Sequence, residues 1–132
     1  TNITGEGVTF YLTGKNSYLD ITGESDVSLS AQKSGPYKGL LFIQDPSVGA
    51  GKASRVMGNS GMKIVGVSYF PTRSLDLGGS GSFGSKSPFM MFVANEVRFF
   101  GNGQLHIQAN YTAAGYGGME LPAADGSARL IN

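Results

Sequence analysis

The chain has 132 residues, enough for one domain with its own core, and it carries a formal net charge of +1 with only 14% charged residues. This balance provides no basic field for nucleic acid or an anionic membrane, and the absence of cysteine excludes a disulfide framework and thiolate metal ligands. Glycine, with 21 copies, exceeds its usual share of about 7%, and it predicts an all-β chain with many tight turns.

A first series of expected strands is dense in apolar residues. These runs are "VTFYL" (8–12), "LLFIQ" (40–44), "VGVSYF" (65–70) and "MMFVA" (90–94). Such density is typical of strands stacked on like strands inside a sheet.

A second series is centred on glycines. The segments are "LDITGESDVSL" (Gly23), "SRVMGNSGMKI" (Gly58), "LDLGGSGSFGS" (Gly79) and "VRFFGNGQLHI" (Gly101). The glycines are 35, 21 and 22 residues apart, within the usual repeat length of solenoids. The sequence therefore contains an irregular repeat, each unit being strand, bend and strand.

The aligned positions around each glycine are apolar at alternating residues. Two residues before it stand Ile21, Val56, Leu77 and Phe99. Four residues after it stand Val27, Met62, Phe83 and Leu105, and six after it Leu29, Ile64, Ser85 and Ile107. Period-two alternation on both sides of a bend predicts a parallel β-helix or β-solenoid, right-handed by the general preference of crossovers, with turns of 21 to 35 residues. A β-sandwich with hairpins at the Gly-Asn-Gly turns is the alternative.

Opposite charges alternate in one further column, three residues before the glycine. Its members are Asp20, Arg55, Asp76 and Arg98. In stacked turns they would form a structural charge ladder on the surface, and its main effect would be to penalise a slipped register.

The domain organisation follows from the same pattern. Residues 1–110 are expected to form the turns, with loop insertions near 31–39 and 45–54, and residues 111–132 to form a tail or cap of the same domain. The chain begins without Met and without a signal peptide, so we read it as a mature product or an excised part of a longer protein.

No residue set predicts catalysis, a metal or a cofactor. The nearest approaches to a carboxylate dyad are Asp20 with Asp76, and Glu24 with Asp26, which the charge ladder explains better. His106 is the only histidine and is expected to be solvated, and "GAGKAS" (49–54) is too short for a phosphate loop.

Exposed aromatic residues are the candidate binding residues. Tyr37 lies in an expected loop, and Tyr111 and Tyr116 lie in the Gly-rich tail. A tyrosine on a loop can stack on a sugar or anchor a protein contact.

Three segments carry a family likeness: "GVTFYLTG", "SGPYKGLLFIQDPS" and "VMGNSGMKIVGVSYFPTRSLDLGGSGS". In this order they resemble the C-terminal region of TadG-like proteins, which are associated with assembly of Flp (Tad-type) pili in bacteria, over residues 5–108. The resemblance implies a secreted or envelope-anchored protein with an upstream anchor and domain. Members often carry a cysteine near "SPFMMFVA", which this chain lacks, so no role of that thiol can be transferred.

These observations together predict a non-enzymatic, extracellular structural or adhesive module of a pilus-associated surface protein. The expected partners are pilus or cell-envelope proteins, a second copy of the chain in an end-to-end filament, or glycans; nucleic acid and membrane contact are not expected from this segment. A polysaccharide-binding or polysaccharide-degrading β-helix protein is the alternative.

Overall fold

The computed structural model describes residues 2–22, 26–110, 112 and 114–117, and the regular structure there is β apart from one short 3-10 helix, η1 (Pro46–Val48). The strands are β1 (Asn2–Gly5), β2 (Phe10–Leu12), β3 (Asp20–Ile21), β4 (Asp26–Ser30), β5 (Leu40–Gln44), β6 (Ser54–Gly58), β7 (Lys63–Gly79), β8 (Ser82–Phe83), β9 (Met90–Gly101) and β10 (Gln104–Leu105). Every pairing between these strands is parallel. The predicted β-solenoid is therefore confirmed, and the β-sandwich alternative is wrong.

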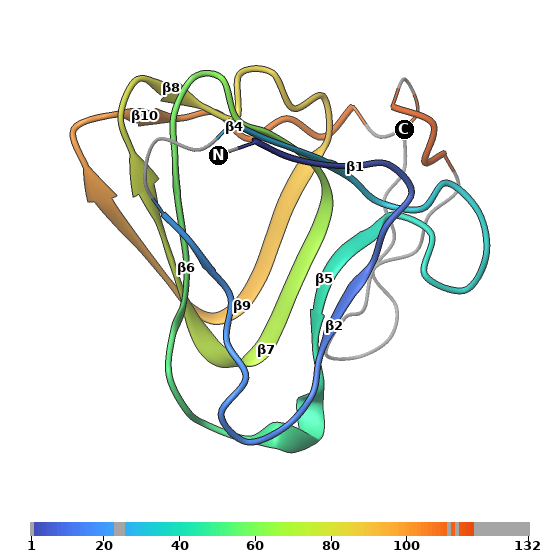
Figure 1. The fold of residues 1–132 in the computed structure, drawn as a ribbon, viewed down its shortest axis with the longest axis vertical. Coiled ribbons are helices and arrows are strands. Elements are labelled where there is room, and N and C mark those ends of the chain that lie inside the picture. Colours follow the sequence, from blue (N-terminus) through green and yellow to red (C-terminus); the bar gives the residue numbers. More distant parts are fainter. Residues whose placement is uncertain (1, 23–25, 111, 113, 118–132) are drawn as a thin grey trace.

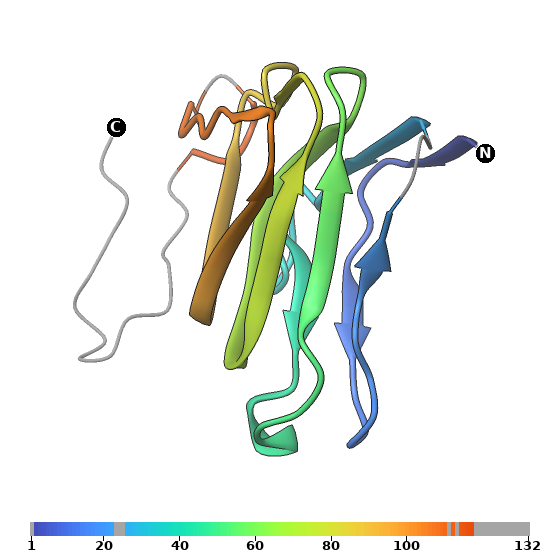
Figure 2. The same ribbon diagram turned by 90° about the vertical axis from the view of Figure 1, so that its left-hand side faces the viewer.

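The chain winds around three faces with a triangular outline (Figure 1). The first face carries β1, β4, the start of β7, β8 and β10; the second carries β2, β5 and the first arms of β7 and β9; the third carries β3, β6 and the second arms of β7 and β9. There are about four turns, with the N-terminal and C-terminal turns at opposite sides of Figure 2. Seen from the N-terminal turn the chain runs clockwise as it recedes, so the coil is right-handed.

Equivalent side chains lie over one another in successive turns. Ile21 pairs with Val56, Val56 with Leu77, and Leu77 with Phe99, which confirms the predicted interior column. Val56 and Leu77 are 1% and 0% exposed, whereas Phe99, in the last turn, is 61% exposed. Each fully buried side chain of this size contributes about 1.5–3 kcal/mol. The stacking of turns thus supplies the core, and only the inner turns are fully covered.

The glycine column forms the corner between the third and first faces. Gly58 pairs with Gly79, and Gly79 with Gly101. A Cβ at Gly79, where φ is +134°, would lie 1.8 Å from the carbonyl oxygen of Gly58. A side chain there would collide with the preceding turn, so the stacked backbone itself requires glycine.

Two insertions account for the longer first repeat. Val56 follows Ile21 by 35 residues, but Leu77 follows Val56 by only 21. The additional residues form the loop 32–39, an irregularity within β5, and the loop 45–53 that contains η1. Both predicted loops are confirmed, although the first starts one residue later than expected because Ala31 is buried and its N–H donates to Val65 O.

The prediction that Ser85 stacks under Ile64 is wrong. The hydroxyl Oγ of Ser87 accepts a hydrogen bond from the Ile64 N–H at 2.9 Å, whereas Ser85 is exposed. The chain bulges outward here, because Gly66 pairs with Met90, 24 residues later, although Gly58 pairs with Gly79, 21 residues later. The glycine corners on either side of the bulge keep a spacing of 21 and 22 residues, so the glycine pattern gives no sign of the shift.

The described part of the tail packs against the side of the coil. Tyr116 packs on Phe89, with ring centroids 5.6 Å apart, and the Lys38 ammonium donates to Gly117 O at 2.8 Å. These residues join the last turn to the loop 32–39, at the corner between the first and second faces. They do not cover the end of the coil, and residues 118–132 lie outside the described residues.

Candidate functional sites

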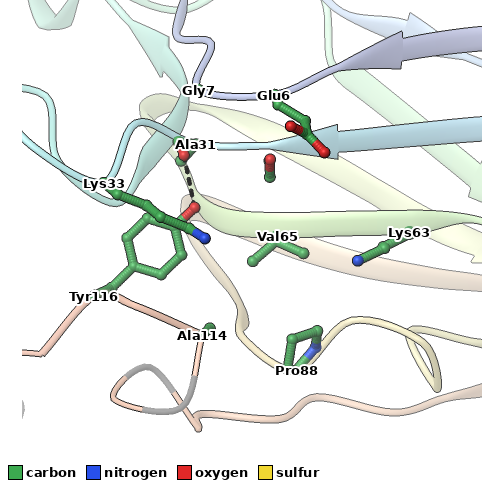
Figure 3. A pocket seen from close by; sticks show the side chains of 10 residues that line it. Glu6, Gly7, Ala31, Lys33, Lys63, Val65, Pro88, Ala114 and Tyr116 are labelled. Atoms are coloured by element: carbon green, nitrogen blue, oxygen red, sulfur yellow. Dashed lines mark hydrogen bonds between the residues drawn. The ribbon is translucent and has the colours of Figure 1, made fainter.

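A pocket of about 540 Å³ opens on the outer surface of the first face, next to the loop 32–39 (Figure 3). Val65 and Pro88 provide apolar lining. Glu6, Lys33 and Lys63 provide three charged groups. Ser30, Ala114 and Tyr116 also line the pocket. The pocket therefore combines one apolar surface with polar groups from the coil, a loop and the tail.

Strand alternation sets the direction of two lining side chains. Ile64 is fully buried, so its neighbours Lys63 and Val65 point out of the first face. Lys33 comes from the loop 32–39, and its stem passes Gly115 of the tail, where an added Cβ would lie 3.2 Å from the Lys33 Cδ. The pocket consequently exists only while the tail and the loop lie against the coil.

The charged groups of the pocket have no salt-bridge partner in the described part of the chain, where Arg98 with Asp76 forms the one ion pair. In Figure 3 the ammonium groups of Lys33 and Lys63 extend toward the pocket from opposite sides, and the Glu6 carboxylate approaches it from the bend after β1. Two cations and one carboxylate leave an excess positive charge in the pocket. An anionic group with neighbouring hydroxyls would be complementary to this arrangement.

The expectation that Tyr116 is an exposed aromatic residue is wrong. Its side chain is 0% exposed, and its hydroxyl donates a hydrogen bond to Ala31 O at 2.6 Å. Burial raises the pKa of the Tyr116 hydroxyl. The ring fills the corner between the tail and the coil, so Tyr116 supports the pocket wall.

Of the other two predicted binding residues, Tyr37 is not among the residues that line this pocket. Tyr37 lies in the loop 32–39 and is 43% exposed, as expected. Tyr111 lies outside the described residues. A binding role for Tyr37 stays a prediction.

The charge ladder is confirmed in register but forms only in part. Asp20 pairs with Arg55, Arg55 with Asp76, and Asp76 with Arg98 in the parallel ladders. Only Arg98 Nε approaches a carboxylate closely, at 2.8 Å from Asp76 Oδ1. Asp76 is 6% exposed because the neighbouring turns cover it, contrary to the expected surface position. Asp20 in the first turn is exposed.

The two ends of the coil present apolar surface. At the N-terminal end the most exposed large side chains are Ile3, Phe10, Tyr11 and Tyr18, each at least 41% exposed. At the C-terminal end they are Phe99, Phe100 and Ile107, each at least 49% exposed. Phe99 and Phe100 also line a second cavity of about 260 Å³. Both ends therefore combine unpaired strand edges with apolar side chains.

Sequence reasoning missed a buried arginine. Arg73 is 1% exposed and donates to backbone carbonyls on two loops, including Lys15 O at 2.7 Å and Ser17 O on one and Gly49 O on the other. The guanidinium joins the loop after β2 to the loop after β5. An added Cβ at Gly51 would lie 2.7 Å from the Arg73 Cζ. This glycine within "GAGKAS" was the one sign in the sequence that a large side chain packs against that loop.

The remaining polar candidates do not assemble a reactive group. His106 is exposed after β10, as expected, and Glu24 lies outside the described residues. Within the described ranges, no three His, Cys, Asp or Glu side chains are placed to hold a metal ion.

The comparisons with known proteins add no family. No family model, curated protein or solved structure matches this chain. In the described part of the chain, no helix has the length and hydrophobicity needed to cross a bilayer.

Proposed function

We propose that this chain is a non-enzymatic structural module of an extracellular, pilus-associated surface protein, and that it acts by joining further copies end to end. The pilus association and the extracellular location rest on the resemblance of residues 5–108 to TadG-like proteins. The end-to-end contact rests on the geometry of the two terminal turns. The observation that carries it is that both ends expose the apolar columns that fill the core between them.

The columns continue in register from one copy to the next on two faces. On the third face, Phe99 of one copy would meet Ile21 of the next, as Leu77 meets Phe99 within the chain. On the second face, Phe92 would meet Phe10, which already stacks on Phe42 with ring centroids 5.3 Å apart. Such a contact extends the existing sheets by backbone hydrogen bonds and buries the apolar ends.

The charge ladder continues in the same register. It begins with the exposed Asp20 and ends with Arg98, so the junction places an arginine of one copy against an aspartate of the next. The alternation found within the chain is preserved across the junction. A shift by one residue would break this pairing and turn the apolar columns outward.

The first face sets a condition on the junction. It holds one layer more than the other two faces, because both β1 and β10 lie on it. In-register stacking brings β1 of the next copy to the position of β10. The two-residue strand β10 must therefore leave its position and be replaced by the four-residue strand β1 of the next copy.

Disulfide cross-linking tests the junction directly, since the chain has no cysteine of its own. In the double variant Asp20→Cys with Arg98→Cys, the two positions in one chain are three strand spacings apart, about 14 Å. This exceeds the reach of a disulfide, about 7 Å between Cα atoms, so any bond must join two chains. We expect a ladder of covalent oligomers under mild oxidation.

The matched control moves one cysteine along the strand. Asp20→Cys with Glu96→Cys presents a thiol on the same outward side but two residues out of register, and should cross-link much more slowly. Amide exchange at Gln104 and His106, whose N–H groups donate to Gly81 O and Phe83 O, should accelerate on assembly as β10 is displaced. Equal cross-linking in both variants, or a monomer at millimolar concentration, would overturn the proposal.

A further inference from the structure

We propose that the pocket between the first face, the loop 32–39 and the tail binds an acidic saccharide, with one uronate carboxylate held between Lys33 and Lys63. This site lies on the side of the coil and does not rest on end-to-end assembly, although Glu6 directly follows β1 of the N-terminal turn. Its polar groups serve none of the described contacts that hold the fold, whereas the Tyr116 hydroxyl beside them is used to fix the tail.

The two lysines define the anionic end of the ligand. They come from separate elements, the start of β7 and the loop 32–39, and their ammonium groups face the same cavity. Neither has a carboxylate within 4.0 Å in the described part of the chain. Both side chains are exposed, and two convergent ammonium groups with no anionic partner are complementary to one carboxylate.

Glu6 and Ser30 distinguish a sugar from a simple anion. The Glu6 carboxylate at the pocket edge accepts hydrogen bonds from vicinal hydroxyls, which phosphate and sulfate lack, and the Ser30 hydroxyl can donate or accept. The space between the two lysines thus favours an anionic group, and the neighbouring Glu6 and Ser30 favour a hydroxylated group of the same ligand. A uronic acid carries both on one ring.

The lining between these polar groups suits a sugar ring. Val65 is only 4% exposed, so the partly exposed Pro88 provides most of the apolar surface that the C–H face of a pyranose can contact. The cavity, about 540 Å³, lies in the usual range for small-ligand sites and is open to solvent on one side. An oligosaccharide could therefore place one uronate in the pocket and continue out of it.

Calorimetric titration with a hyaluronan tetrasaccharide, which contains glucuronate, tests the proposal against the neutral chitotetraose. We expect binding of the acidic sugar and at least about tenfold weaker binding of the neutral one. The double variant Lys33→Ala with Lys63→Ala should lose at least about tenfold in affinity. The matched control, Lys15→Ala with Lys52→Ala, removes the same charge outside the pocket and should stay within about twofold.

A second variant separates sugar recognition from anion binding. Glu6→Gln should weaken tetrasaccharide binding, because the amide is a poorer acceptor for vicinal hydroxyls, but it should strengthen binding of inorganic phosphate by removing repulsion. Phosphate that competes as well as the tetrasaccharide would overturn the saccharide assignment. Equal affinity for the neutral sugar, an unchanged affinity in the double lysine variant, or no binding at millimolar concentration would also overturn it.

Discussion

At the scale of single residues, Arg73 is the side chain on which the loops depend most. A buried guanidinium without a carboxylate partner is costly unless its N–H groups are satisfied, and here backbone carbonyls of two loops accept them. Its hydrogen bonds hold the loop after β2 and the loop after β5 together. The side chain therefore couples two successive turns of the coil.

Replacement of Arg73 by Met should lower the free energy of unfolding by roughly 3 kcal/mol, because hydrogen bonds to a charged group are lost and carbonyls are left without their donor. Arg73→Lys should recover only part of this free energy of unfolding. A single ammonium group lacks the forked geometry by which the guanidinium reaches both loops. Urea unfolding followed by circular dichroism measures both. The exposed Arg55→Met serves as control and should change stability by less than about 0.5 kcal/mol. Equal effects at positions 55 and 73 would contradict this role.

At the scale of elements, the tail depends on one aromatic residue. Tyr116 is the only described tail residue that is fully buried, and it contacts both the last turn through Phe89 and, through Ala31, the residue that precedes the loop 32–39. The loop 32–39 also reaches the tail through Lys38. Docking of the tail thus forms the pocket wall and fixes the inserted loop at the same time.

Alkaline pH should release the tail before the coil unfolds. Because burial raises the pKa of Tyr116 in the folded state, docking is complete below the unfolded pKa of about 10 and is lost as the pH rises through the higher folded value. Nuclear magnetic resonance signals of Gly115 and Gly117 should report this transition. Tyr116→Phe should abolish the pH dependence and weaken docking by about 1 kcal/mol through loss of the bond to Ala31. Tyr37→Phe, at an exposed tyrosine, should change neither the pH dependence nor the strength of tail docking. A transition that persists in Tyr116→Phe would show that another group controls the release of the tail.

The elements differ in how far the sequence specifies them. Stacked positions such as Val56 and Leu77 were predictable because every turn repeats the same inward pattern beside a glycine. Ser87 was not, since a short bulge shifts the register without leaving a mark in composition. The pocket was missed because Lys33, Lys63 and Glu6 come from three turns or loops and share no motif. Tyr116 was misjudged because a Gly-rich tail usually predicts exposure, whereas its burial depends on a contact far away in the sequence.

At the scale of the whole molecule, a solenoid is close to one-dimensional, so the cost of a substitution depends on its turn as much as on its residue type. Leu77 and Phe99 occupy the same column one turn apart, but the first is 0% exposed and the second 61%. Truncation in the inner turn leaves a cavity that two neighbouring turns enclose. Truncation at the end removes a side chain that has a neighbour on one side only.

Leu77→Ala should therefore destabilise the monomer by about 2–5 kcal/mol, whereas Phe99→Ala, although it removes more atoms, should cost less than about 1 kcal/mol. Urea unfolding at low micromolar concentration measures both without assembly. At high protein concentration the destabilisation caused by Phe99→Ala should increase, whereas that caused by Leu77→Ala should not. The Phe99 side chain would then be buried in the proposed junction, and it stabilises only the associated state. A cost for Phe99→Ala that equals that of Leu77→Ala at low concentration would mean that the last turn is already covered, and the end could then not serve as a junction.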